Sequence, residues 1–311
     1  MNTQGFNIYG YCIKIMSTEF SLSELKVNDD FKLFSTTVEE NPDVLIVIKK
    51  LTDLRLRGFR IGKTAMCEVR QLSLHCRQLV YRKHEKILAL VNDSSVSKRR
   101  LIEINAADNA ILDDVLYFLI NSCCGEHLDK KGLMRIHALS YSSNDRCGVV
   151  YGFPGAGKST VAIGLMKSSD VRIFSDEISI YDIENKVLLP FPIRIAVNDI
   201  YEKVGLATKF TYFFNTKYLV GLEKDKIATS RKLTHLHFLD WSRKPVLFYL
   251  ISMLLGIGLI QMWEYFLRFN NIPTLFRITV NRLKLCRILF SYKPHFLDRN
   301  LSLEEKLKIL L

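Results

Sequence analysis

One glycine-rich stretch constrains this chain more than any other feature of its sequence. Residues 148–162 read as a short apolar strand, a tight turn and the first turn of a helix, and Gly152–Ser159 matches the spacing G-x-x-x-x-G-K-S/T. Glycines at Gly155 and Gly157 let backbone N–H groups curl around an anion. The pattern therefore predicts a phosphate-binding loop, followed by a helix whose first N–H groups point at the same anion.

The polar residues of this loop suit a nucleoside triphosphate. Lys158 is placed to carry a positive charge to the β- and γ-phosphates, and the Ser159 hydroxyl is placed to ligate Mg²⁺. The other residues that we expect to contact the nucleotide are Gly152, Pro154, Gly155, Ala156, Gly157 and Thr160. We therefore expect the chain to bind a nucleoside triphosphate together with Mg²⁺.

An acidic pair follows the loop at a position that suits phosphoryl transfer. This reaction needs a carboxylate that helps to hold Mg²⁺, and a kinase also needs one that accepts the proton of the attacking hydroxyl. Asp176 and Glu177 stand eighteen and nineteen residues beyond Lys158, at the end of a strand expected over 171–174. They are the first candidates for both roles.

A second acidic candidate, Asp240, closes a strand expected over 233–240. His235 and His237 alternate there with apolar residues, so we expect this strand to be less uniformly buried than a central parallel strand. Asp240 therefore ranks below Asp176. The chain also lacks the Leu-Ser-Gly-Gly-Gln stretch of transporter ATPases and the Asn-Lys-x-Asp signature of Ras-like GTPases.

Composition and charge place the chain among packed globular proteins. Of its 311 residues, 48% are hydrophobic and 24% are charged, which argues against disorder. The net charge of +12 suits an acidic partner such as nucleic acid or a membrane surface, and it equally suits a charged surface without a specific role. The seven cysteines form no C-x-x-C pair and no signal arrangement opens the chain, so we expect reduced thiols in a cytoplasmic protein.

The chain divides by pattern into three regions. Residues 1–108 are β-rich, 109–242 hold the nucleotide-binding core, and 243–311 are helical and basic. In the first region we expect strands over 6–15, 43–49, 65–72, 78–81, 87–91 and 101–104, a turn or helix start over 21–25, and polar connectors over 55–63 and 92–100. In the core we expect helices over 109–124 and 160–166, strands over 133–141, 171–174 and 233–240, and a hairpin of 178–183 with 186–189.

The C-terminal region differs in composition from the rest. The apolar run 246–260 is shorter than the ~18–20 residues that a membrane span needs, so we expect a buried helix and no membrane span. A basic helical segment follows over 268–292. Residues 243–311 carry eleven Lys and Arg and four Asp and Glu, which leaves a solvated face and a docking surface for an acidic partner as alternatives.

The residues around the loop resemble the catalytic core of the HPr kinase/phosphorylase superfamily. Met134–Ala138 carries a histidine before the loop strand, Ser175–Glu177 follows the loop helix, and Pro190–Arg194 is similar to a Pro-Phe-Pro-Arg turn with one residue inserted. The resemblance covers roughly 133–191 well. Within the superfamily, the resemblance is closer to stand-alone HPr-kinase-like proteins found with peptide modification, including lasso-peptide serine kinases, than to the bacterial HPr enzymes.

This resemblance implies a P-loop kinase core of the HPr kinase and PEP carboxykinase type, with ATP as the nucleotide. It implies that His137 lies beside the γ-phosphate, that Asp176 is the general base or a Mg²⁺ partner, and that Glu177 joins the metal site. The chain departs from the family because its second acid is Glu rather than Asp, and the acidic pair lies one residue further from Lys158. The division of roles between the two acids therefore stays open. The family's glycine-rich substrate loop is also not evident, which argues against HPr itself as the substrate.

Taken together, the residues and the resemblance predict an α/β kinase. We expect it to transfer the γ-phosphoryl group of Mg-ATP to a serine-type hydroxyl of a peptide or protein, with Asp176 accepting the proton of that hydroxyl. Arg194, Arg231 and Lys232 are candidates for charge stabilisation. Phosphorylation of a small hydroxyl metabolite is an alternative within this class. The alternative from another class is a nucleotide-dependent switch ATPase that engages nucleic acid or an acidic partner. An oligomer is also left open.

Overall fold

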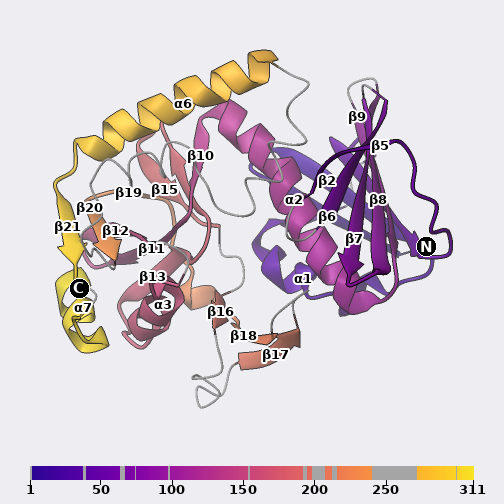
Figure 1. Cartoon of the computed structure of the whole chain (residues 1–311). Helices are drawn as coiled ribbons and strands as arrows, with labels where there is room; N and C mark the ends of the chain where they lie inside the picture. Colours follow the sequence, from indigo (N-terminus) through magenta and orange to yellow (C-terminus); the bar gives the residue numbers. More distant parts are fainter. Residues whose placement is uncertain are drawn as a thin grey trace. The chain divides into compact units, whose positions relative to one another are not determined.

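The computed structural model shows a mixed α/β protein with several sheets (Figure 1). It describes residues 2–37, 40–63, 67–73, 75–96, 99–152, 155–191, 195–197, 207–211, 216–239, 272–298 and 300–311. Contacts divide the chain into two compact units, the first holding the chain up to His127 and the second most of the described residues from Leu128 onward. Each unit is considered separately below.

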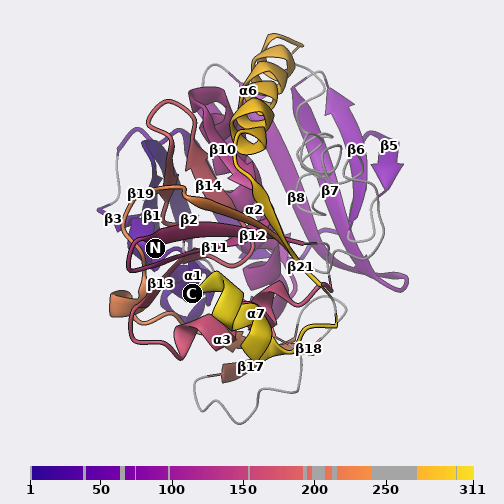
Figure 2. The ribbon, with the colours of Figure 1, turned by 90° about the vertical axis from the view of Figure 1, so that its left-hand side faces the viewer.

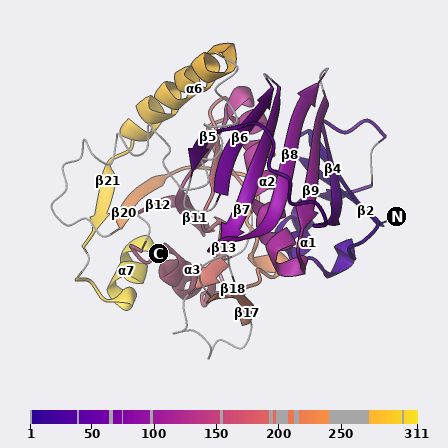
Figure 3. The same cartoon turned by 45° about the vertical axis from the view of Figure 1, so that its right-hand side comes forward.

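The first unit is built on a sheet with nine described strands, in the order β3-β1-β2-β4-β9-β8-β7-β6-β5. The strands are β1 (Asn2–Ile8), β2 (Tyr11–Ser17), β3 (Ser35–Thr36), β4 (Val44–Lys50), β5 (Phe59–Lys63), β6 (Cys67–Ser73), β7 (Cys76–Lys83), β8 (Lys86–Val96) and β9 (Arg99–Ala106). Strands β2, β4 and β9 are parallel and the other pairs are antiparallel. Figure 3 shows β6, β7 and β8 side by side.

Helices complete this unit. Three short ones follow β2, namely η1 (Leu22–Glu24), α1 (Val27–Asp30) and η2 (Lys32–Phe34), so a helix start over 21–25 is confirmed. Helix α2 (Asn109–Lys131) begins where the Asp108 carboxylate accepts a hydrogen bond from the Ile111 N–H at 2.9 Å, which is helix N-capping. It ends before Gly132, whose φ of +81° suits glycine. The expected helix over 109–124 is confirmed and is longer.

Two expectations for the first unit are wrong. The strand expected over 6–15 is a hairpin, because Tyr9 and Gly10 both have positive φ (52° and 84°) and reverse the chain. The Asn7 side chain stabilises this turn by accepting a hydrogen bond from the Gly10 N–H at 2.8 Å. The connectors expected over 55–63 and 92–100 also contain β5 and the ends of β8 and β9, because charged residues tolerate the exposed faces and edges of a sheet.

The second unit holds a five-stranded sheet among its described residues, in the order β13-β11-β12-β20-β21. Its strands are β11 (Ala138–Ser143), β12 (Arg146–Tyr151), β13 (Val171–Ser175), β20 (His235–Leu239) and β21 (Pro294–Leu297). Strands β12, β20 and β21 are parallel, whereas β11 is antiparallel to both of its neighbours. Helix α3 (Lys158–Met166) follows β12 and packs beside α7 (Leu303–Leu310) (Figure 2).

Two smaller sheets accompany it. One has the order β10-β14-β15-β19, with β10 (Leu133–Ile136), β14 (Ser179–Asp182), β15 (Val187–Leu189) and β19 (Arg231–Lys232). The other has the order β16-β18-β17, with β16 (Ile195–Val197), β17 (Ala207–Thr211) and β18 (Thr216–Val220). The other helices in the described part of this unit are η4 (Lys224–Lys226) and α6 (Ile272–Phe290). The expected β14–β15 hairpin and basic helix are confirmed in the described residues.

Two further expectations are wrong in the second unit. The strand expected over 133–141 is divided into β10 and β11, which belong to different sheets and separate at His137. Strand β20, expected to be less uniformly buried than a central parallel strand, lies between β12 and β21, and its His237 is only 2% exposed. A histidine can occupy such a position because burial favours its neutral form.

Helix α7 packs against one side of α3. An added Cβ at Gly164 of α3 would lie 3.0 Å from the Leu307 side chain, so glycine permits this close approach. The buried Tyr141 hydroxyl donates a hydrogen bond to the Leu310 carbonyl at 2.7 Å. A capping box between Ser302 and Glu305 starts the helix.

Several sequence predictions lie outside the described residues. They are Pro154, Arg194, Asp240 and the apolar run 246–260. In the parts of the chain that the structure describes, no helix combines the length and the apolar character that crossing a membrane requires.

Candidate functional site

The glycine-rich turn connects β12 to α3. Gly155 and Gly157 have φ values of +84° and +93°, which a residue with a side chain rarely adopts, and Gly157 is the N-cap of α3. Gly152 is required for a different reason, because an added Cβ would lie 3.1 Å from the Ala156 Cβ and 3.3 Å from the Leu239 Cβ. The local sequence therefore produces a strand, a left-handed turn and a helix N-terminus in immediate succession.

The lysine and the serine of this turn both make short polar contacts. The Lys158 side chain folds back over the turn and donates a hydrogen bond from Nζ to the Gly152 carbonyl at 2.7 Å. It is only 8% exposed. The Ser159 hydroxyl donates a hydrogen bond to the Asp176 Oδ2 at 2.7 Å, and Asp176 is itself only 4% exposed. The loop and the acidic pair are thus in direct contact.

Sheet register explains why these residues meet. Strands β12 and β13 are both antiparallel to β11, so they run in the same direction and end at the same edge of the sheet. Strand β11 begins at that edge, where Ala138 lies opposite Tyr151, and Ser140 lies opposite Ser175. His137, which precedes β11, and Asp176, which follows β13, are therefore brought to the end of β12. Ligands bind at such carboxyl ends in many α/β proteins.

The charges at this edge influence one another. Burial lowers the pKa of Lys158, and the carboxylates of Asp176 and Glu177 oppose this change. Burial also lowers the pKa of His137, as does the Lys158 charge, whereas the Glu177 carboxylate and a hydrogen bond with the Glu177 backbone raise it. His137 is accordingly neutral at pH 7, within electrostatic reach of both Lys158 and Glu177.

The donor set at this edge fits a hard divalent cation. No group of three or more His, Cys, Asp or Glu residues in the described ranges could hold a metal ion. Magnesium does not need such a group, because it is usually bound by one or two carboxylates together with phosphate oxygens and water. The Ser159 hydroxyl and the Asp176 carboxylate, 2.7 Å apart, are oxygen donors of the required kind.

Two cations expected near the loop lie elsewhere. Arg231 and Lys232 form β19, and the Arg231 carbonyl accepts a weak hydrogen bond from the Cys147 thiol at 3.9 Å. Cys147 is near the start of β12, about 13 Å of strand from Tyr151 at about 3.3 Å per residue. The structure therefore places neither cation at the loop edge of the sheet.

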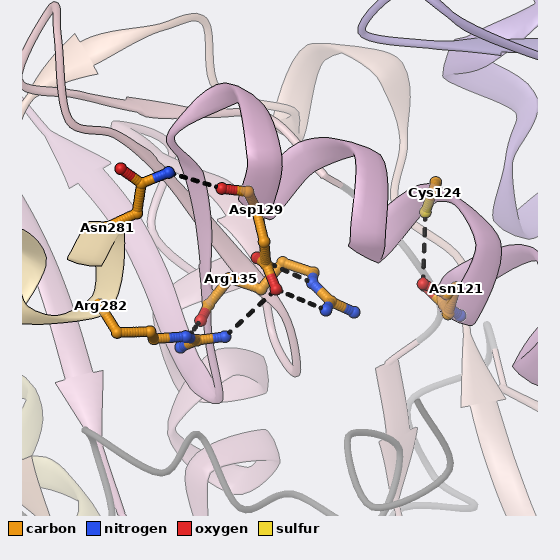
Figure 4. Close-up of polar contacts among 6 residues, drawn as sticks. All are labelled: Asn121, Cys124, Asp129, Arg135, Asn281 and Arg282. Atoms are coloured by element: carbon orange, nitrogen blue, oxygen red, sulfur yellow. Dashed lines mark hydrogen bonds and ion pairs between the residues drawn. The ribbon is translucent and has the colours of Figure 1, made fainter. Parts of the chain in front are cut away.

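A second cluster of buried charges was not anticipated from the sequence (Figure 4). Asp129 at the end of α2 is fully buried and pairs with Arg135 of β10, at 2.9 Å between Oδ2 and Nη2. Arg282 of α6 approaches the same carboxylate at 3.7 Å and donates to the Arg135 carbonyl at 2.7 Å. The Asn281 side chain donates to the Asp129 carbonyl at 2.8 Å. No local pattern indicates this cluster, because α6 lies about 150 residues along the chain from its partners.

Three histidines also lie together on β20 and β21. The ring centroids of His237 and His295 are 5.4 Å apart, and those of His235 and His237 are 6.0 Å apart. Burial, together with the charges of His295, His235 and Arg146, lowers the pKa of His237 to about 3. The His237 ring is therefore neutral near pH 7.

No family model matches the chain, and no curated protein matches it either.

Proposed function

We propose that this protein is a P-loop kinase that transfers the γ-phosphoryl group of Mg-ATP to the serine hydroxyl of a peptide or protein. The observation that carries the proposal is the 2.7 Å contact between Ser159, at the start of α3, and Asp176, at the end of β13. It joins a hydroxyl of the G-K-S sequence to a buried carboxylate beside the loop. A metal-dependent phosphotransferase needs this pair of donors.

In this proposal each residue has a distinct task. The N–H groups at the start of α3 bind phosphate oxygens, and Lys158 exchanges its hydrogen bond to the Gly152 carbonyl for one to the phosphates. Ser159 and Asp176 would hold Mg²⁺, which when bound would supply positive charge beside the transferred phosphoryl group.

The proton of the attacking hydroxyl needs an acceptor. Because Asp176 already contacts Ser159, we assign it to the metal, which leaves the half-buried Glu177 as the general base. The neutral His137 ring, bonded to the Glu177 backbone, orients this segment. ATP as the nucleotide, and a peptide or protein as the acceptor, follow from the resemblance to HPr-kinase-like proteins.

The test is transfer of label from ATP carrying a radioactive γ-phosphate. Purified protein is incubated with lysate of its own cells, and acid-stable label on a peptide or protein is the expected result. Lys158→Ala and Asp176→Asn should abolish it. The matched controls are Lys167→Ala and Glu184→Gln, which remove an exposed lysine and an exposed carboxylate of the same unit and should leave labelling unchanged.

Other outcomes identify the alternatives. Label found only in inorganic phosphate would replace the kinase with a nucleotide-dependent switch ATPase. Label on a small molecule would keep the kinase and change its acceptor. Labelling that persists in Asp176→Asn would show that Asp176 is not a required metal ligand, and it would contradict the proposed site.

A further inference from the structure

The outward side of helix α6 carries large apolar side chains in a regular row. Phe276, Leu283 and Phe290 are 71%, 55% and 55% exposed. They are seven residues apart, and seven residues make nearly two turns of a helix with about 3.6 residues per turn, so the three lie on one side. We call them the apolar row. Figure 1 shows α6 running along the outside of the second unit.

The packing of α6 does not require this row. The buried residues of α6 lie on an adjacent side of the helix, and they are Ile278, Arg282, Leu285, Cys286 and Leu289. Leu285 and Leu289 join the core around β12 and β20, and Arg282 joins the Asp129 cluster. The helix is therefore anchored by one side and presents three large apolar side chains on the exposed side next to it.

Positive charge accompanies the apolar row. Arg277, Lys284 and Arg287 are exposed on α6, and none of them takes part in an ion pair within the described residues. The sequence from 265 to 297 contains six Lys and Arg and no Asp or Glu. An acidic partner therefore meets no repulsion along the helix.

We propose that the outer side of α6 binds the surface of an anionic lipid bilayer. An amphipathic helix that lies in the interface buries its apolar side chains at the boundary between headgroups and acyl chains, while its basic residues contact anionic headgroups. The 19-residue helix is about 28 Å long at about 1.5 Å per residue, and the apolar row spans most of it. Nucleic acid would use the basic residues and leave the apolar row in water, because affinity for it comes chiefly from phosphate contacts.

The experiment uses the full-length protein and vesicles of phosphatidylglycerol and phosphatidylcholine in equal amounts, with phosphatidylcholine vesicles for comparison. Co-sedimentation should show binding to the anionic vesicles that weakens with added salt. Replacing the apolar row by serine (Phe276→Ser, Leu283→Ser, Phe290→Ser) should weaken binding on the order of a hundredfold. Replacing Arg277, Lys284 and Arg287 by Gln should weaken it roughly fivefold for each charge.

A matched control comes from the first unit. Leu54, Leu56 and Phe59 are also exposed, and their replacement by serine should leave vesicle binding unchanged. Urea unfolding of each variant verifies that it is folded. The proposal is overturned if the chain ignores anionic vesicles, if the apolar-row variant binds as tightly as the unchanged protein, or if the α6 variants lose binding to a DNA duplex instead. None of these results depends on kinase activity.

Discussion

The second unit contains two clusters of buried charge that differ in construction. In the Asp129 cluster, Arg135 and Arg282 direct guanidinium groups at one carboxylate, and three elements meet there. The second cluster, which we call the Lys158 cluster, consists of Lys158, Ser159 and Asp176. It lies where strands that run in the same direction end beside a left-handed turn. In the Asp129 cluster, the buried charges are paired with one another. The Lys158 cluster instead adjoins a helix N-terminus that favours an anion.

The comparison shows that burial of charge does not by itself indicate a functional site. Arginine matches a carboxylate with a rigid fork of donors, so the Asp129 cluster gains geometric specificity from its own pairing. Lysine and serine provide compact groups that can exchange partners at little conformational cost. Location at the ends of parallel strands separates the functional candidate from the structural one.

The largest expected effect is on stability, and it appears when the same Asp→Asn substitution is made separately in each cluster. Asp129→Asn removes the carboxylate from two buried arginines and should lower the free energy of unfolding by about 3–5 kcal/mol. Asp176→Asn should lower it by less than about 1 kcal/mol, because the amide oxygen can still accept the Ser159 hydrogen bond. Urea unfolding of the two variants measures both values. Equal losses would mean that the two clusters do not differ as described.

A smaller effect should appear in the pH dependence of nucleotide binding. In the proposed site, phosphates would bind the protonated form of Lys158, whose pKa is lowered in the free protein by burial. Affinity for ATP should therefore be highest where Lys158 is fully protonated. It should fall, at most about tenfold per pH unit, as the pH rises above the pKa of Lys158. Fluorescence anisotropy with a labelled nucleotide measures the decline.

The matched variant for this prediction is Lys158→Arg. Its guanidinium remains charged over the same range, so its affinity should not decline with pH. A similar decline in both proteins would assign the titration to another group and separate Lys158 from nucleotide binding.

The smallest expected effect concerns the ionisation of His137. The Glu177 carboxylate raises the pKa of this ring, so Glu177→Gln should lower it further, as measured by NMR titration of the imidazole. Glu184→Gln, in the turn between β14 and β15, should not change it. An unchanged pKa in Glu177→Gln would show that the two side chains are further apart than the structure places them.

Much of the fold near the loop could be predicted because the signals are local. Positive φ at Gly155 and Gly157 follows from a turn that only glycine adopts readily, and the hairpin of β14 and β15 follows from alternating apolar residues around a polar turn. Asp176 could be chosen because it directly follows an apolar strand after the loop helix. Asp176 lies near the loop because β12 and β13 run in the same direction and end at the same edge of the sheet.

Other features depend on tertiary structure and could not be predicted. The strand break at His137 exists because β10 and β11 pair with different partners, and the sequence 133–141 carries no mark of this. The turn at Tyr9 uses a residue type that rarely takes positive φ. The burial of Asp129 requires partners on β10 and α6.

The sheet that carries the loop is assembled from distant parts of the chain, and this has a consequence for folding kinetics. Strand β12 pairs with β20, with Gly148 opposite His235, and Tyr141 bonds to Leu310, 169 residues away. Strands β5 to β9 of the first unit are instead neighbours in sequence. Because long loops must close before distant strands pair, the β5–β9 meander should form early and the sheet around the glycine-rich turn should be completed late. Any chain that stalls between these events exposes the unpaired edge of β12 and is prone to aggregate.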